Sequence, residues 1–291
     1  MSSEQFVELF VSGLYYGSIY ALVGLGFTTI YSVTKIINFA QGEFVMLGGL
    51  LSFAIFSTYG VSHIPALILS ILIATVIGAL LYLLAIRSAK RASVVSLIII
   101  TIGAAIFIRG LTGQLIGKDF VRPPFFSGDN PIIFLGAHIP PQALWIIGTS
   151  IGLMVLLHLF FSYTMIGKAL KACSVSQTGA SLMGINPMVM GLISFSLAAA
   201  LGAVGGIVIA PLTTTFYGAG ATLGLKGFVA ASIGDFRSQV MTFMGGITLG
   251  IVESYAVAID WGPFKAGYRD AISLMVLVLI LLVRSRRLAS E

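Results

Sequence analysis

Five polar or charged side chains interrupt long apolar stretches of this sequence and could together contact a polar solute. They are Asn38, Gln41, Glu43, Lys226 and Glu253. Where apolar stretches cross a bilayer, an ionisable group costs at least about 2.5–3.5 kcal/mol and usually faces a bundle interior or a wet cavity. We expect Lys226 to pair with Glu43 or Glu253, because either ion pair would lower that cost for both partners. A sparse polar lining that also includes residues 213–215 would suit brief contacts with a small solute.

Three of these residues lie in KIINFAQGEF, residues 35–44. Asn38 can cap a helix that begins at the next residue, and Gln41 can reach back to it as in a capping box. Glu43, one turn further, would be stabilised by the positive end of the helix dipole. Capping near a membrane surface is therefore the alternative to a role in a solute pathway. Gly42 permits close approach of a neighbouring helix or of a substrate.

The motifs of common catalytic sites do not occur. The sequence has no GxxxxGK[ST] phosphate loop, no HExxH pair, no CxxC and no GxSxG elbow. The three histidines, His63, His138 and His158, are scattered, and the single cysteine, Cys173, lies in a basic loop and cannot form an intrachain disulfide. We expect no catalytic residue, no metal site and no cofactor bound by this chain, and hence not an enzyme.

The elements that must position these side chains follow from composition. The chain has 291 residues, of which 58% are hydrophobic and 9% charged, and its mean hydropathy is +1.06; soluble domains have about 25% charged residues. Apolar runs of about 17 to 25 residues can cross a membrane as helices. The sequence predicts an all-α polytopic transmembrane bundle in one domain, residues 1–291. The net charge of +6 comes from basic residues scattered at span ends, which indicates membrane anchoring and topology, with no nucleic-acid partner.

Eight apolar spans are clear, and a ninth segment is ambiguous. The clear spans are Phe6–Ile30, Phe39–Thr58, Pro65–Ile86, Val94–Ile116, Gln142–Phe161, Met188–Ala210, Val240–Ile259 and Ala271–Val283. Residues 217–233, YGAGATLGLKGFVAASI, are short, rich in Gly and Ala and interrupted by Lys226, so they could cross or re-enter.

The distribution of Lys and Arg favours crossing, with nine spans in a range of eight to ten, the N-terminus outside and the C-terminus cytoplasmic. The inner side then holds Lys35, Arg87, Lys90, Arg91, Lys168, Lys171, Arg237, Arg284, Arg286 and Arg287. The outer side holds Lys118, Arg122, Lys265 and Arg269, and Arg109 and Lys226 are left at membrane depth. The glycine pairs Gly13 and Gly17, Gly202 and Gly206, and Gly246 and Gly250 have the small-xxx-small spacing of close helix packing, within the chain or between subunits.

The longest inner loop, residues 162–187, is polar and compatible with a helix over about 167–183. Asn186 is expected to cap the next helix, with Pro187 in its first position. Apolar residues alternate there with Lys168 and Lys171, as in a short helix that lies on the membrane surface or against another protein.

This loop, GKALKACSVSQTGASLMGIN, resembles the cytoplasmic coupling loop of ABC importer permeases of the branched-chain amino acid type. That family of high-affinity leucine, isoleucine and valine permeases also includes urea and short-chain amide permeases. The resemblance continues in order through nearly the whole chain, in GLYYGSIYALVGLGFTTIYSVTKIINFAQGEFVMLGG, KGFVAASIG, GGITLGIVES and YRDAISLMVLVLILLVR.

The resemblance implies a permease subunit of an ATP-binding cassette importer in the bacterial cytoplasmic (inner) membrane, carrying branched-chain or other small amino acids. The implied partners are two cytoplasmic ATP-binding subunits that hold ATP and Mg, a homologous second permease and an extracytoplasmic solute-binding protein. Gly184 would occupy the glycine of the coupling motif. The residues implied in ATPase coupling are Gly167, Lys168, Ala169, Lys171, Ala172, Ala180, Gly184, Ile185 and Asn186.

Three other interpretations stay open. The same type of importer could carry urea or short-chain amides. A stand-alone channel or ion-coupled secondary transporter would move its solute without ATP, and paired broken spans would favour it; the sequence offers one candidate, at 217–233. A structural or receptor-like membrane protein is the third.

Overall fold

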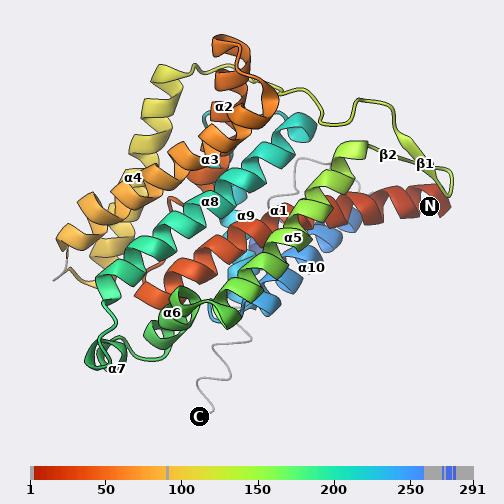
Figure 1. The fold of residues 1–291 in the computed structure, drawn as a ribbon. Helices are drawn as coiled ribbons and strands as arrows, with labels where there is room; N and C mark the ends of the chain where they lie inside the picture. The colour runs from red at the N-terminus through yellow and green to blue at the C-terminus, as the bar shows by residue number, and fades with distance from the viewer. Residues whose placement is uncertain (1–2, 90–91, 259–270, 272, 277, 280–291) are drawn as a thin grey trace.

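A computed structural model describes residues 3–89, 92–258, 271, 273–276 and 278–279 (Figure 1). The elements are α1 (Ser3–Thr34), α2 (Gln41–Tyr59), α3 (His63–Leu80), the π-helix η1 (Leu81–Ile86), the 3-10 helix η2 (Arg87–Ala89), α4 (Val94–Leu115), β1 (Ile132–Phe134), β2 (Ala137–Ile139), α5 (Pro141–Tyr163), α6 (Met165–Val175), α7 (Gln177–Leu182), α8 (Pro187–Thr213), α9 (Ala219–Ile233) and α10 (Gln239–Ala258).

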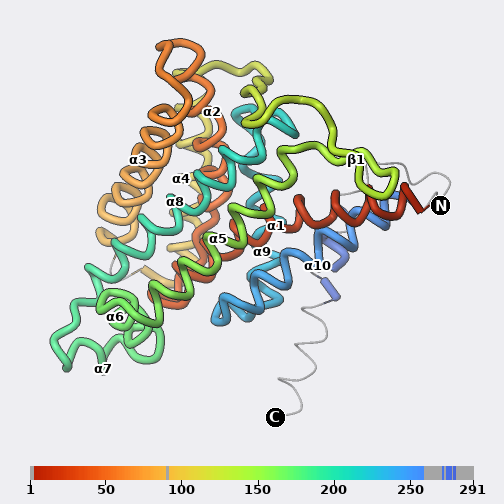
Figure 2. Tube along the Cα trace, turned by 45° about the vertical axis from the view of Figure 1, so that its right-hand side comes forward, coloured from red at the N-terminus to blue at the C-terminus, as the bar shows by residue number. Residues whose placement is uncertain are grey.

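Within the described residues, seven helices are long and apolar enough to cross a membrane: α1, α2, α3 with its continuation to Ala89, α4, α5, α8 and α10. They confirm the predicted polytopic helical bundle and coincide with seven of the eight clear spans. The helix α6 and the short α7 lie at the end of the bundle far from the N-terminus, beyond the ends of α5 and α8 (Figure 2). The opposite end of the bundle carries the β1–β2 hairpin (Figure 1).

The ambiguous segment forms α9, whose 15 residues extend about 22 Å, less than the roughly 30 Å hydrocarbon core. Ahead of α9, Thr215 pairs with Val121 in the loop that follows α4. Beyond α9, Phe236 contacts Tyr31, with ring centroids 5.2 Å apart. Tyr31 lies near the C-terminal end of α1, next to the predicted inner residue Lys35. The segment therefore runs in the direction that a crossing requires. The count of nine spans and the orientation of the termini stay predictions.

Parts of the sequence predictions fall outside the described residues. These are Ile259, the basic residues at 90–91, 265, 269, 284, 286 and 287, and residues 272, 277 and 280–283 of the last span. Ala271 and residues 273–276 and 278–279 of that span are helical.

The core sits around α1, α2, α8 and α9, while α3, α4 and α5 form an outer layer. Much of α2 and α8 is buried, whereas many large apolar side chains of α4 and α5 are exposed, as in Phe107 (68%) and Leu156 (62%). An outer layer with apolar side chains outward is what a bundle in lipid requires, because lipid tails are as apolar as the core.

The predicted small-xxx-small glycines pack helices of this chain against one another. A Cβ on Gly13 of α1 would lie 2.7 Å from the Cα of Ile251 in α10, and a Cβ on Gly17 would lie 2.7 Å from the Cα of Ile247. Gly206 of α8 meets the backbone of α2 at Val45 in the same way. At these glycines the backbone of α10 lies directly against that of α1, and the backbone of α8 lies directly against that of α2.

Two local predictions are wrong. The helix expected from Phe39 begins at Gln41. Its N-cap residue is Ala40, which makes no side-chain hydrogen bond to the helix. Asn38 instead accepts a bond from the Ala40 amide through Oδ1 (3.1 Å), forming a turn ahead of the helix. The helix expected over about 167–183 is broken at Ser176, whose side chain caps α7, because a serine there offers the backbone an alternative to continued helix.

Candidate functional site

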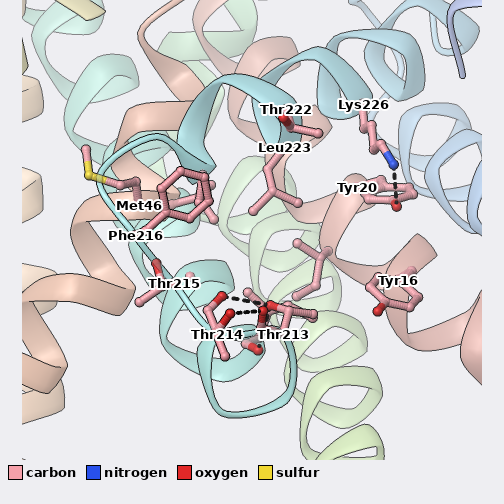
Figure 3. Close-up of a pocket in the computed structure, with 15 residues that line it drawn as sticks. Tyr16, Tyr20, Met46, Thr213, Thr214, Thr215, Phe216, Thr222, Leu223 and Lys226 are labelled. Carbon is pink, nitrogen blue, oxygen red and sulfur yellow. Dashed lines mark hydrogen bonds between the residues drawn. The ribbon is translucent and has the colours of Figure 1, made fainter. Parts of the chain in front are cut away.

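A cavity of about 250 Å³ lies among α1, α2, α8 and α9 (Figure 3). Ligand pockets usually have about 300–1,000 Å³, so this one suits a small solute. Its lining combines hydroxyl groups, one ammonium group and apolar side chains. The lining residues are Tyr16, Ile19, Tyr20, Val45, Met46, Gly206, Ile209, Thr213, Thr214, Thr215, Phe216, Ala219, Thr222, Leu223 and Lys226.

Among the described residues that line the cavity, Lys226 is the one that carries a charge. Its Nζ lies 3.1 Å from Oε2 of Glu253 and donates to the Tyr20 hydroxyl at 3.2 Å. Tyr20 in turn donates to the same Glu253 oxygen at 2.8 Å, and Ser273 donates to the other oxygen. Both charged side chains are almost fully buried, with 6% and 0% exposed. The ion pair thus joins α9 to α10 and is held by hydrogen bonds with Tyr20 of α1 and Ser273.

Glycines place this network. Gly227, next to Lys226, packs against Val23 and Gly24 of α1, and any Cβ at that position would overlap the Val23 side chain. Gly245 of α10 packs in the same way against Ile233 at the end of α9. The three helices can therefore approach closely enough for an ammonium, a phenol and a carboxylate to meet.

A second ion pair joins α2 and α4. Arg109 donates from Nη2 to Oε1 of Glu43, whose side chain is 1% exposed, while that of Arg109 is 31% exposed. Within the described residues, Oε2 of Glu43 and Nε of Arg109 have no hydrogen-bond partner. Oε2 of Glu43 instead lies against Gly220 in the first turn of α9. This pair is less enclosed and less completely hydrogen-bonded than the pair of Lys226 and Glu253.

Gln41 and Asn38 occupy packed positions outside the cavity lining. Gln41 is fully buried between Gly26 and Gly202, and its Nε2 donates to the carbonyl of Ala198 at 2.9 Å. This contact across to α8 replaces the capping box expected from the sequence. Asn38 is also fully buried.

The structure thus separates the predicted pathway residues. Lys226 and the threonines at 213–215 line the cavity, and Glu253 lies behind Lys226. Lys226 pairs with Glu253, one of its two expected partners, while Glu43 pairs with Arg109. A part in a solute pathway stays a prediction for all five residues.

Sequence reasoning missed several cavity residues. Tyr16 and Tyr20 stand four residues apart in an apolar helix and so share one face, which is a signal that the sequence offers. Thr222 stands four residues ahead of Lys226 on α9 and offers the same signal. The sequence around Ser273 offers no such signal, because the hydrogen bond from Ser273 to Glu253 depends on how the last span packs.

The loop 162–187 is shaped by three side-chain caps. Thr164 and Ser176 accept bonds from Gly167 and Gly179 at the starts of α6 and α7 (2.9 and 3.0 Å). Asn186 accepts from the Met188 amide at 3.0 Å, which confirms the predicted cap with Pro187 in the first turn of α8.

Gly184 ends α7 in a left-handed conformation, with φ of +82°. The amide of Ile185 donates to the carbonyl of Ala180 (3.0 Å), and the amide of Gly184 donates to that of Ser181 (3.0 Å). These are the two bonds of a Schellman motif, which favours glycine because it has no Cβ. The predicted glycine therefore has a backbone role.

One side of α6 and α7 is buried and the other is bare. Leu170, Cys173 and Ala180 join the core cluster that contains Val33 of α1, and burial raises the pKa of the Cys173 thiol. Within the 162–187 loop, Cys173 is thus a buried residue of α6. On the bare side, large apolar side chains are exposed by 83–85%: Val175, Leu182 and Met183. We call these three residues the apolar tip.

The residues assigned to coupling fall on both sides. Gly167 and Ala180 are buried, and Ala169, Ala172 and Ile185 are half-buried. The exposed ones are Lys168, Lys171, Gly184 and Asn186.

Two hydrogen bonds tie the loop to α1. Gln177 of α7 donates from Nε2 to the carbonyl of Val33 at 2.7 Å. Lys35, just beyond α1, donates to the carbonyl of Ser174 at 2.9 Å. Burial, together with the nearby positive charge of Arg237, lowers the pKa of Lys35. The helix that carries Tyr16 and Tyr20 is thus attached directly to α6 and α7.

Within the described residues, no three His, Cys, Asp or Glu side chains gather as metal ligands would. The polar groups of the cavity, one ammonium and several hydroxyls, are suited to hydrogen bonding with an organic solute.

A family model and two curated relatives agree in their description. The family described as "Branched-chain amino acid transport system / permease component" matches residues 9–281. The high-affinity branched-chain amino acid transport system permease protein LivH of Escherichia coli K12 is 30% identical, over 97% of this chain and 95% of that protein. BraD of Pseudomonas aeruginosa, with the same description, is 27% identical over 96% of this chain and 94% of that protein.

The solved structure of PsaBC from Streptococcus pneumoniae in complex with Fab aligns over 96% of this chain and 90% of that one. Its TM-score is 0.48 at 15% identity, a likeness too distant to carry an argument.

Proposed function

The chain belongs to the family of permease components of branched-chain amino acid transport systems, and from this premise we propose how it works within an importer. It is the membrane-spanning subunit of an ATP-binding cassette importer for branched-chain or other small amino acids. Its partners are two cytoplasmic ATPase subunits, which hold ATP and Mg, a homologous second permease and an extracytoplasmic binding protein. The chain contributes the path and has no ATPase chemistry of its own.

The observation that carries this proposal is the form of the 162–187 loop. Its caps and its Schellman motif fix the backbone, while the apolar tip of Val175, Leu182 and Met183 is exposed by 83–85%. Exposed apolar side chains on a rigid, polar-flanked element are typical of a surface that docks against another protein. An ATPase subunit is the partner that the family implies there.

Transmission into the membrane would pass through α1. The bonds from Gln177 to Val33 and from Lys35 to Ser174 hold α6 and α7 to one end of α1. Tyr16 and Tyr20, near the middle of the same helix, line the cavity. ATPases that contact the loop differently with and without ATP would therefore bias two arrangements of α1 and of the cavity.

A pair of glycine variants tests the coupling. Gly184→Asp places a side chain at φ +82° beside the apolar tip, and Gly60→Asp places the same side chain at φ +63° beyond α2; a Cβ at either position meets open space. A non-glycine residue in this conformation costs about 1–2 kcal/mol in both cases. We expect Gly184→Asp alone to lower leucine uptake per ATP hydrolysed, measured in proteoliposomes with the copurified complex and its binding protein. Equal ratios for the two variants would contradict a docking role of this loop.

The alternative importer of urea or short-chain amides is separated by the same assay with labelled urea in place of leucine. An ATP-independent channel or secondary transporter would move its solute without nucleotide.

A further inference from the structure

We propose that the cavity among α1, α2, α8 and α9 is a transient binding site for an α-amino acid, with its carboxylate on Lys226, its ammonium at the end of α8 and its side chain on the apolar wall. This inference rests on the proposed function and gives it a place in the structure.

Lys226 contacts both a buried ion-pair partner and the cavity. It binds Glu253 and Tyr20 (3.1 and 3.2 Å), and it also forms part of the cavity wall. A carboxylate in the cavity can approach this ammonium directly, and hydrogen bonds to charged groups are the stronger class. Within the described residues, Glu253 offsets the charge of Lys226, so this ion pair adds no net charge to the cavity wall. A neutral zwitterion therefore leaves no net charge in the low-dielectric interior, whereas a simple anion or cation would.

The opposite pole of the cavity is the C-terminal end of α8. The last carbonyl groups of a helix carry partial negative charge. That of Pro211 accepts a hydrogen bond from Nε of Arg122 at 2.6 Å, and the carbonyls beyond it, with two lone pairs each, can accept from the solute. The chain turns sharply at Thr214, whose φ is +61°, and Thr213, Thr214 and Thr215 all line the cavity (Figure 3). Carbonyl and hydroxyl oxygens are acceptors for an ammonium group. The two poles thus have the polarity needed by the two ends of an amino acid.

Apolar side chains form the remaining wall. Ile19, Val45, Met46 and Leu223 come from α1, α2 and α9, and Phe216 lies beside them. A branched aliphatic side chain would be desolvated here, whereas urea would leave this wall without a partner. The cavity therefore favours an amino acid over the amide alternative.

Cysteine protection tests occupancy without relying on transport. Because Cys173 is the single cysteine of the chain, Cys173→Ala gives a cysteine-free background for a thiol at Thr222, which lines the cavity and is exposed. In the assembled complex, leucine should slow the reaction of Thr222→Cys with a methanethiosulfonate reagent in a saturable way. A thiol from Tyr59→Cys, at the end of α2 and 76% exposed, should not be protected. The assay is run with and without a nonhydrolysable ATP analogue.

Analogues of leucine examine the two poles. 4-Methylpentanoate lacks the ammonium group, so its half-protecting concentration should be at least about tenfold higher than that of leucine. This factor corresponds to the loss of one charge-assisted hydrogen bond. 3-Methylbutan-1-amine, which lacks the carboxylate, should show a loss at least as large. Equal potency of the three compounds would overturn the assignment of the poles.

Two variants examine Lys226 itself. Lys226→Met should raise the half-protecting leucine concentration at least about tenfold. The double variant Lys226→Met with Glu253→Gln should do the same while removing both charges of the ion pair, so it remains informative where the single variant fails to assemble.

Unchanged protection in the double variant would overturn the role of Lys226. Absence of leucine protection at Thr222→Cys in both nucleotide states would overturn the site itself. If the wild-type complex still imports leucine with ATP in that case, the proposed function stands and the site is wrong. If uptake does not need ATP, the proposed function fails.

Discussion

The cavity and the 162–187 loop differ in which side chains they bury and which they expose. At the cavity, charged and phenolic side chains are buried and bonded to one another, with Lys226 and Glu253 almost fully enclosed. In the loop, the backbone is fixed by caps, and large apolar side chains are exposed. The first arrangement preserves a polar site in an apolar environment, and the second presents a surface to a partner. Variants of the cavity should therefore alter stability and solute selectivity, while variants of the loop should alter the use of ATP.

The largest effect is expected from Glu253→Gln. It removes the carboxylate that lies 3.1 Å from the buried ammonium of Lys226, and breaking a buried ion pair in this way costs about 3–5 kcal/mol. Thermal unfolding of the detergent-purified complex should show a marked loss of stability. The double variant Lys226→Met with Glu253→Gln should recover much of it; a double variant as unstable as the single one would show that the charge is not the cause.

Glu43→Gln tests the same substitution in an ion pair that is less enclosed. Its partner Arg109 is 31% exposed and one oxygen of Glu43 has no partner within the described residues. We expect a smaller loss, about 1.5–3 kcal/mol for a hydrogen bond to a charged group. The same unfolding assay applies, and a loss equal to that of Glu253→Gln would refute the ranking by burial.

In the loop, Gln177→Met keeps the length of the side chain and removes the bond to Val33. One hydrogen bond is worth about 0.5–1.5 kcal/mol, so leucine uptake per ATP should fall about two- to tenfold. The concentration of leucine that half-protects Thr222→Cys should not change. Thr178→Val, a surface change on the neighbouring residue, is the control, and an equal fall there would remove the special role of Gln177.

The smallest effect concerns pH. Because burial and Arg237 lower the pKa of Lys35 below 10.5, the unfolded chain binds this proton more tightly than the folded chain does. Stability should therefore rise with pH between the lowered pKa of Lys35 and 10.5, in the wild type relative to Lys35→Met. Lys35 is exposed over much of its surface, so the slope is small. Denaturant unfolding at alkaline pH measures it, and a falling difference would contradict the sign.

The sequence predicts most of the bundle because long apolar runs determine transmembrane helices whatever their neighbours. It also predicts the cap of α8, since Asn186 and Pro187 act locally. The pairing of Glu43 with Arg109 could not be found, because it depends on how α2 and α4 pack.

The predicted capping box failed for the same kind of reason. Gln41 finds a carbonyl on α8, at Ala198, in a notch between two glycines, which local sequence does not reveal. The choice of Glu253 as the partner of Lys226 likewise follows from the close contact of α9, α10 and α1.

The most direct measurement is labelled leucine uptake and ATP hydrolysis, recorded together, by proteoliposomes that contain this chain copurified with its ATPase and permease partners and supplied with the binding protein. We predict uptake that requires ATP and stops when ATP is omitted. Leucine that enters the vesicles at the same rate without ATP, or through this chain alone, would contradict the account.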